Sequence, residues 1–154
     1  MPLPNQALVL VLDGRKSLFF RNHGDENQID LRTEAHDERE DAPDREMKTD
    51  AAGSAPRGAG GGDTQRPAMG ETDYHQQEED KWVKAAADQL RTRALRNDFD
   101  ALAIVAPPMA LGVLRKALHK EVERRIVLTL NKEMSGRPIP DIEQLLTSES
   151  AATG

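Results

Sequence analysis

The chain has 154 residues, a length that suits one domain with a single core. Its composition is 37% hydrophobic and 3% aromatic residues. It has no cysteine, which excludes disulfides, thiolate catalysis and cysteine-bound zinc and fits a reducing compartment. The formal net charge of −6 excludes a general polyanion-binding protein, so any contact with nucleic acid requires a local basic patch.

The first part of the chain predicts three strands in an antiparallel meander. Two short apolar runs, residues 7–12 and 17–21, are joined by Asp13-Gly14-Arg15-Lys16, and Asp-Gly is typical of a β-hairpin turn. Residues 28–33 alternate apolar and polar side chains after a turn at Asn22-His23-Gly24. We therefore expect a third, half-exposed strand there.

The N-terminal apolar run also bears on localisation. No basic region precedes it and no small-residue cleavage site follows it, so it does not fit a secretory signal. No apolar run in the chain approaches the roughly 20 residues that a membrane span needs. We expect a soluble, cytoplasmic protein with no membrane partner.

Residues 34–70 predict a long loop, acidic at first and glycine-rich later. The segment has no periodic apolar face, and it contains Pro43 and Pro56. Its composition is typical of disorder, and it is far longer than an ordinary connection inside a domain. We expect it to become ordered only in a complex.

Three consecutive glycines, Gly60, Gly61 and Gly62, lie in this loop ahead of Gln65. They do not form a phosphate-binding P-loop, because no Gly-Lys-Ser or Gly-Lys-Thr follows. A flexible linker is the more common use of such a tract. A functional tip is the alternative, because glycine allows backbone conformations that are closed to other residues.

A helix is predicted over residues 71–97, because apolar side chains recur at intervals of three and four residues. Thr72 or Asp73 is the expected N-cap, and acidic residues at the start with arginines at the end suit the helix dipole. The apolar positions are Trp82, Val83, Ala86, Ala87, Leu90 and Ala94.

The start of this helix raises the question of a metal or acid–base site. His75 and Glu79 lie one turn apart, and Asp73 is close to them in sequence. No second histidine is near, so a capped, solvated acidic helix start is the better interpretation. Asp13 raises the question of a nuclease site that binds two metal ions. One carboxylate cannot hold two ions, however, and aspartate is favoured at the start of a turn because its side chain bonds to the backbone. We expect no metal and no other cofactor.

The second half of the chain predicts strand, helix, strand, helix. A continuous apolar run at 101–106 indicates a strand buried on both faces, and Pro107-Pro108 ends it. A helix over 109–122, a strand over 124–130 and a short helix over 140–146 follow, and residues 147–154 form a loose tail. Short connections imply a parallel crossover.

This order of elements is that of an RNase H-like α/β sandwich. We expect a five-stranded mixed sheet, in which an antiparallel three-strand meander is followed by a parallel β–α–β unit, with helices on both faces. The domain spans residues 6–146.

A cluster of basic residues lies on the helix predicted at 109–122 and just after it. The sector opposite the leucines could hold phosphates and make binding sensitive to salt. An ordinary solvated helix face is the alternative. The cluster consists of Arg115, Lys116, His119, Lys120, Arg124 and Arg125.

Three segments carry a resemblance to a known family: "VLVLDGRKSLFFRNHG", "ETDYHQQEEDKW" and "FDALAIVAPPMALGVLRKALHKEVERRIVLTLNKEM". Over residues 6–146 the chain resembles the bacterial host attachment protein family, described as required for attachment to host cells. That family is grouped with bacterial relatives of the middle domain of archaeal and eukaryotic class I release factors.

The resemblance implies a role for the glycine-rich loop. In release factors a Gly-Gly-Gln tip enters the peptidyl transferase centre, where the glutamine helps to place the water that cleaves peptidyl-tRNA. The matching region here is 60–65, in which Asp63 and Thr64 separate Gln65 from the glycines. The resemblance thus marks Gln65 as the candidate catalytic residue, Gly60, Gly61 and Gly62 as the loop tip, and Asp73, His75 and Glu79 as a possible functional helix start.

The sequence as a whole predicts a cytoplasmic module that binds the ribosome or a structured RNA through its basic cluster, with little or no enzymatic activity. One alternative is a regulatory protein whose acidic loop docks a protein partner and affects host attachment indirectly. Another is a peptidyl-tRNA hydrolase that acts through the glycine-rich loop. The sequence predicts no oligomeric state.

Overall fold

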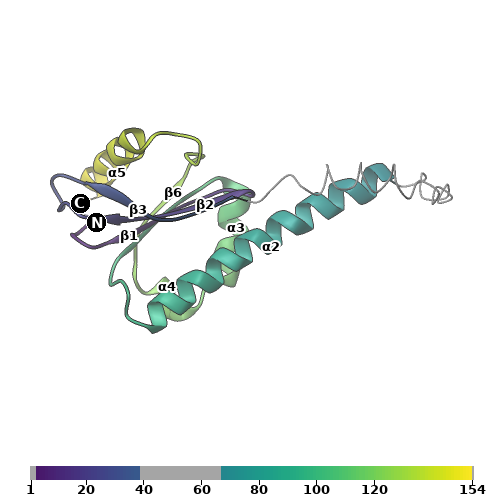
Figure 1. The fold of residues 1–154 in the computed structure, drawn as a ribbon, viewed down its shortest axis with the longest axis horizontal. Coiled ribbons are helices and arrows are strands. Elements are labelled where there is room, and N and C mark those ends of the chain that lie inside the picture. Colours follow the sequence, from purple (N-terminus) through teal and green to yellow (C-terminus); the bar gives the residue numbers. More distant parts are fainter. Residues whose placement is uncertain (1–2, 39–66, 154) are drawn as a thin grey trace.

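A five-stranded mixed sheet organises the molecule (Figure 1). The computed structural model describes the backbone of residues 3–38 and 67–153, and the side chains of residues 3–38 and 74–150. In chain order the elements are β1 (Leu8–Leu12), β2 (Lys16–Asn22), β3 (Leu31–Glu38), α2 (Pro67–Leu95), β5 (Leu102–Ala106), α3 (Pro108–Ala117), α4 (Lys120–Glu123), β6 (Ile126–Asn131) and α5 (Ile139–Thr153).

The strand order is β3-β2-β1-β5-β6. The first three strands pair antiparallel, and β1, β5 and β6 run parallel. This topology confirms the expected meander followed by a parallel unit, and with it the RNase H-like sandwich. The central strands β1 and β5 are buried along their whole length, because helices cover both of their faces.

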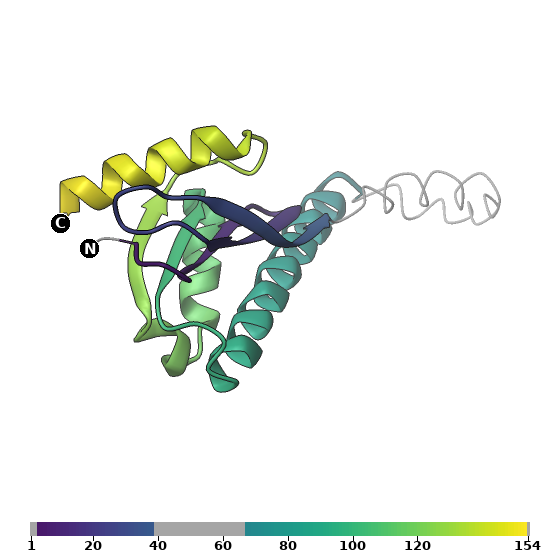
Figure 2. The same ribbon diagram turned by 60° about the vertical axis from the view of Figure 1, so that its left-hand side comes forward.

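Alternate residues of the sheet supply two separate cores. Leu10 and Phe19 face the side that α2, α3 and α4 cover, whereas Val9 and Phe20 face the side that α5 covers. Figure 2 shows α5 on one side of the sheet and α2 with α3 on the other. Because side chains alternate along a strand, a shift of one residue in β1 would exchange the two cores.

The hairpin turn between β1 and β2 confirms the role expected for Asp13. Its Oδ1 accepts hydrogen bonds from the backbone N–H groups of Arg15 and Lys16, both at 2.6 Å. A Cβ atom on Gly14 would lie 2.9 Å from side-chain carbons of Glu79. The turn therefore packs directly against α2, and glycine allows that approach.

The third strand lies later in the chain than its alternating pattern indicates. Residues 28–30 belong to a turn, in which Asn22 Oδ1 accepts hydrogen bonds from the backbone N–H groups of Gly24 and Asp30. β3 then continues to Glu38, paired with Lys16 of β2. The expected loop over 34–70 is therefore wrong at its start, because backbone pairing extends the strand through polar residues.

The same expected loop is wrong at its end, because α2 begins at Pro67 and not at residue 71. Proline suits the first turn of a helix, because a backbone N–H at that position would have no acceptor within the helix. Thr72 and Asp73 thus lie inside the helix and do not cap it. In Figure 1 the first half of α2 projects beyond the sheet, and among the side chains of α2 that the structure describes, 74–95, the first buried one is Val83.

The helix predicted over 109–122 is two helices. α3 ends at Ala117, and Leu118 has an extended backbone, with φ −72° and ψ 137°. His119 then caps α4, because its Nδ1 accepts a hydrogen bond from the backbone N–H of Glu121 at 3.0 Å. The apolar spacing continues through the break, so the sequence pattern does not reveal where α3 ends and α4 begins.

The C-terminal helix is longer than expected. α5 runs to Thr153, so the loose tail predicted from residue 147 is wrong over 147–153. Thr147 Oγ1 donates a hydrogen bond to the Glu143 carbonyl at 2.8 Å, and Ser150 is buried. Within the described residues, no helix combines the length and apolarity of a membrane span.

Candidate nucleic-acid interface

Three exposed cations of the predicted cluster lie on α3 and α4. Leu111 and Leu114 turn inward from α3, and Val122 turns inward from α4. The helical period then places the intervening basic residues in solvent. We call the exposed residues Arg115, Lys116 and Lys120 the basic face.

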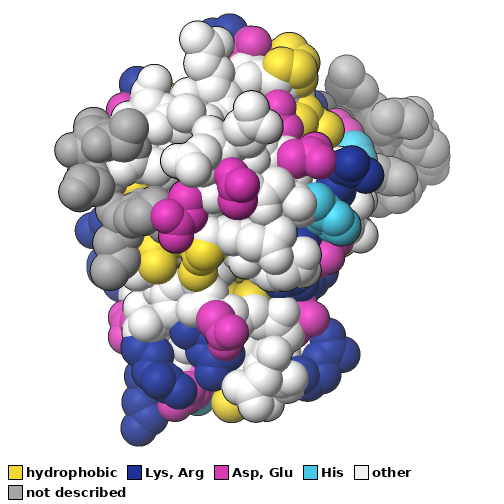
Figure 3. Space-filling view, turned by 90° about the vertical axis from the view of Figure 1, so that its left-hand side faces the viewer, with side chains coloured by type: hydrophobic (Ala, Val, Ile, Leu, Met, Phe, Trp, Pro, Cys, Tyr) yellow, Lys and Arg dark blue, Asp and Glu magenta, His cyan; other side chains and the backbone are white. Residues whose placement is uncertain are grey.

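None of the basic-face cations has a carboxylate within 4.0 Å among the residues that the structure describes. Other exposed cations do have one: Lys81 lies 3.5 Å from Glu78, and Arg91 lies 3.8 Å from Asp88. Viewed from the end opposite the projecting helix, Lys and Arg side chains, with Asp and Glu side chains among them, gather toward the rim formed by α4 and the end of α2 (Figure 3). The basic face thus carries three cations without a direct ion pair among the described residues, on a chain whose net charge is negative.

Arg124 borders the basic face but has a partner. Its Nε donates to Glu121 Oε1 at 2.8 Å, and its side chain is 66% exposed. An exposed pair of this kind contributes little free energy, about 0–1 kcal/mol, so a phosphate can compete with Glu121 for the guanidinium.

Arg125 and His119 of the predicted cluster have internal contacts instead. The Arg125 guanidinium donates to the Phe99 carbonyl at 2.9 Å and lies 5.7 Å from the centre of the Phe99 ring. Its side chain is only 10% exposed. His119 uses Nδ1 to cap α4. We therefore base the functional argument on the three basic-face residues and Arg124.

A groove adjoins the basic face between α2 and α3. It has a volume of about 570 Å³. Lys116 belongs both to the groove and to the basic face, and Met109 in the groove is 68% exposed. We call this feature the α2–α3 groove; it is lined by Asp80, Lys84, Pro108, Met109, Gly112, Val113, Lys116 and Ala117.

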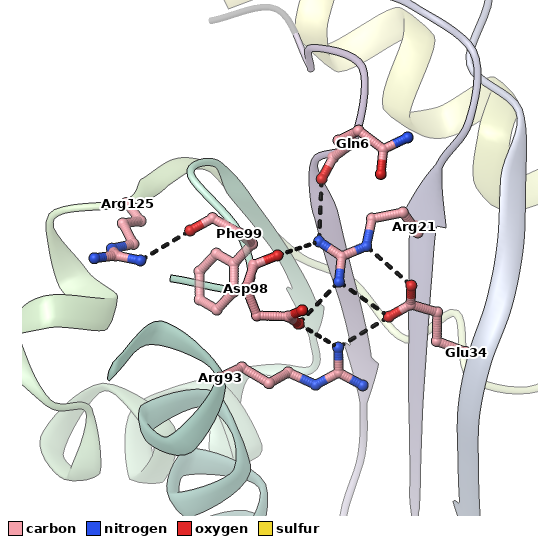
Figure 4. Close-up of polar contacts among 7 residues, drawn as sticks. All are labelled: Gln6, Arg21, Glu34, Arg93, Asp98, Phe99 and Arg125. Atoms are coloured by element: carbon pink, nitrogen blue, oxygen red, sulfur yellow. Dashed lines mark hydrogen bonds and ion pairs between the residues drawn. The ribbon is translucent and has the colours of Figure 1, made fainter. Parts of the chain in front are cut away.

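An ion-pair network, absent from the sequence predictions, holds the end of α2 to the meander (Figure 4). Arg21 of β2 is 7% exposed; its guanidinium contacts Glu34 at 3.0 Å and Asp98 at 2.9 Å. Arg93 also contacts both carboxylates at 2.9 Å. The backbone carbonyl groups of Gln6 and Asp98 accept further hydrogen bonds from Arg21. Two arginines and two carboxylates therefore form a closed network.

The network shifts the pKa values of both carboxyl groups downward. Partial burial alone would raise the pKa of Glu34 and of Asp98, but hydrogen bonds and charge from Arg21 and Arg93 outweigh it. A carboxyl group whose pKa is lower in the folded state than in the unfolded state stabilises the fold above its unfolded pKa. That stability is lost as the pH falls through the folded pKa.

We therefore expect acid to weaken the fold partly through Glu34. In urea unfolding between about pH 7 and about pH 3, the free energy of unfolding of the wild type should fall with decreasing pH. Glu34→Gln should be less stable at neutral pH, and its free energy of unfolding should fall less steeply in acid. Parallel curves for the two proteins would contradict this account.

A second polar cluster, also absent from the sequence predictions, closes the carboxyl ends of β1 and β6. Ser135 is buried, and its hydroxyl lies within hydrogen-bond distance of Asp13 Oδ2 and, at 2.7 Å, of Glu133 Oε1. One hydroxyl hydrogen serves one acceptor at a time. The cluster ties the loop after β6 to the hairpin turn, which gives Asp13 a second structural role.

The remaining predicted site residues lie apart from the basic face or outside the described residues. Glu79 packs on the hairpin turn, and the His75 ring meets the Tyr74 ring edge-on at 5.9 Å. The described residues contain no group of three His, Asp or Glu side chains placed to hold a metal ion. The side chain of Asp73 lies outside the described part, as do Gly60, Gly61, Gly62 and Gln65.

Comparison with known families supports the predicted resemblance to release factors. A family model described as bacterial archaeo-eukaryotic release factor family 12 matches residues 6–146. No curated protein matches the chain. The matched description does not mention host attachment, so that part of the resemblance stays a prediction.

Proposed function

Because the chain belongs to bacterial archaeo-eukaryotic release factor family 12, we propose that it binds the ribosome or a structured RNA through the basic face of α3 and α4. Membership of a release-factor family suggests partners in translation. The basic face supplies the chemistry for such a partner, because lysine and arginine bind the phosphates of RNA. We propose the cytoplasm as the place of action, since ribosomes are found there.

The observation that carries this proposal is the lack of carboxylate partners on the basic face. The chain has 27 acidic and 21 basic residues, so carboxylates are abundant. Yet among the described residues none lies within ion-pair distance of Arg115, Lys116 or Lys120. Phosphates, which a bound RNA supplies in a row, can therefore bind these cations without displacing a carboxylate.

The other functions predicted from sequence depend on residues outside the described part. Peptidyl-tRNA hydrolysis would require Gln65, and docking of a protein partner with an indirect effect on host attachment would require the acidic loop. Both stay predictions. Binding of RNA is the function for which the described residues supply the contacts.

Salt dependence tests the proposal. With three or four phosphate contacts, the logarithm of the binding constant for a labelled fragment of ribosomal RNA should fall with the logarithm of salt concentration, with a slope of about −2 to −4. The single variant Lys116→Gln should make this slope shallower by about one contact, roughly 0.7 to 0.9. A flat salt dependence, or no binding at low salt, would contradict the proposal.

A further inference from the structure

The α2–α3 groove has the chemistry of a nucleotide site. We propose that it takes one unpaired nucleotide of a bound single-stranded RNA, with the base against the apolar wall of α3 and the adjacent phosphates on Lys84 and Lys116. This inference rests on the proposed RNA binding and adds the strand type that the protein prefers.

The two sides of the groove offer different contacts. α3 contributes Met109 and Val113, and an exposed methionine offers a polarizable surface for an aromatic ring. α2 contributes Lys84, which faces the groove together with Lys116 of α3. Unstacked bases bind to apolar or planar side chains while cations hold the phosphates. The volume, about 570 Å³, lies in the range of small-ligand sites.

Gly112 gives an independent reason to regard the groove as a binding site. It lies inside α3, where glycine is less favourable than alanine. A Cβ atom built on Gly112 would meet nothing within 4 Å, and no described glycine has a positive φ. Neither packing nor backbone conformation requires glycine at this position. Its effect is to keep the groove open.

Asp80 supplies a hydrogen-bond acceptor for a nucleotide in this groove. Its carboxylate lines the groove and is held by a hydrogen bond from Gln76 Nε2 to Oδ1 at 2.9 Å. A carboxylate accepts hydrogen bonds from an N–H group of a base or from a ribose 2′-hydroxyl. A duplex keeps its bases stacked, so the groove should serve only unpaired nucleotides.

The test compares a labelled decauridylate with an RNA duplex of the same length. Gly112→Leu should fill the groove and weaken binding of the single strand about tenfold, whereas the duplex should still bind through the basic face. The variant should melt at or above the temperature of the wild type, since leucine is the better helix former. Lys84→Glu, at the opposite wall, should likewise weaken binding of the single strand more than that of the duplex.

Gly136→Leu is the matched control, because a Cβ atom there also meets nothing within 4 Å and Gly136 lies outside the groove. It should bind decauridylate like the wild type. Unchanged binding of the single strand by Gly112→Leu would overturn the groove inference and leave the basic face in place. If Gly112→Leu lost a binding to an oligoglutamate peptide that the wild type shows, and kept the RNA binding of the wild type, the groove inference would be overturned in favour of a peptide site. If the wild type binds neither RNA, the proposed function fails as well.

Discussion

Replacing all three basic-face residues, as Arg115→Glu, Lys116→Glu and Lys120→Glu in one chain, should lower the affinity for ribosomal RNA by about 100-fold or more at physiological salt. Each change removes an attraction to phosphate and adds a repulsion. The three side chains are exposed and have no carboxylate partner among the described residues, so the fold should lose little stability. Filter binding and thermal melting of the same preparations measure the two effects separately.

The control for this variant changes the net charge equally on another surface. Each replacement of a cation by glutamate lowers the net charge by two, so three replacements take it from −6 to −12. Arg32, Lys132 and Arg137 are exposed residues outside α3 and α4 and provide a set of equal charge, in which Arg32 pairs with Asp30 and Arg137 with Asp141. Affinity within a few-fold of wild type is expected for this control. An equal loss in both variants would show that total charge, and not the basic face, determines binding.

The largest effect on stability is expected for Arg21→Met, about 2–3 kcal/mol in the free energy of unfolding. The change would leave Glu34 and Asp98 with Arg93 as their remaining partner in the network, and it would remove the donor to the Gln6 carbonyl. Methionine has a similar length, so lost charge and hydrogen bonds would dominate over lost volume. Urea unfolding at neutral pH measures the effect.

A neighbouring pair gives the comparison for Arg21. Arg32 lies 3.0 Å from Asp30, but both side chains are well exposed, at 63% and 46%. Arg32→Met should therefore lower the free energy of unfolding much less than Arg21→Met does. If the two variants were equally stable, the network at Arg21 would not hold α2 to the meander as described.

The fold could be predicted from sequence wherever the apolar pattern alone decides it. The Asp-Gly turn and the continuous apolar runs of β1 and β5 are of this kind. The pattern failed where polar contacts decide. β3 continues through a polar segment because its backbone pairs with β2 and Arg21 holds Glu34, and the break after α3 depends on the His119 cap.

The candidate site could be predicted only in part, because tertiary packing selects among residues of one type. The sequence grouped six basic residues, but only the structure shows that Arg125 lies on Phe99 while Lys116 stays in solvent. The groove could not be predicted, because it requires Gly112 and Met109 of α3 to face Asp80 of α2. No pattern within either helix indicates that pairing.

Sedimentation of the tagged protein in a bacterial lysate through sucrose gradients at low and high salt tests the central claim most directly. If the basic face binds ribosomes or their RNA, the protein should migrate with ribosomal subunits at low salt and remain at the top of the gradient at high salt. A protein that stays at the top under both conditions would contradict ribosome binding through the basic face.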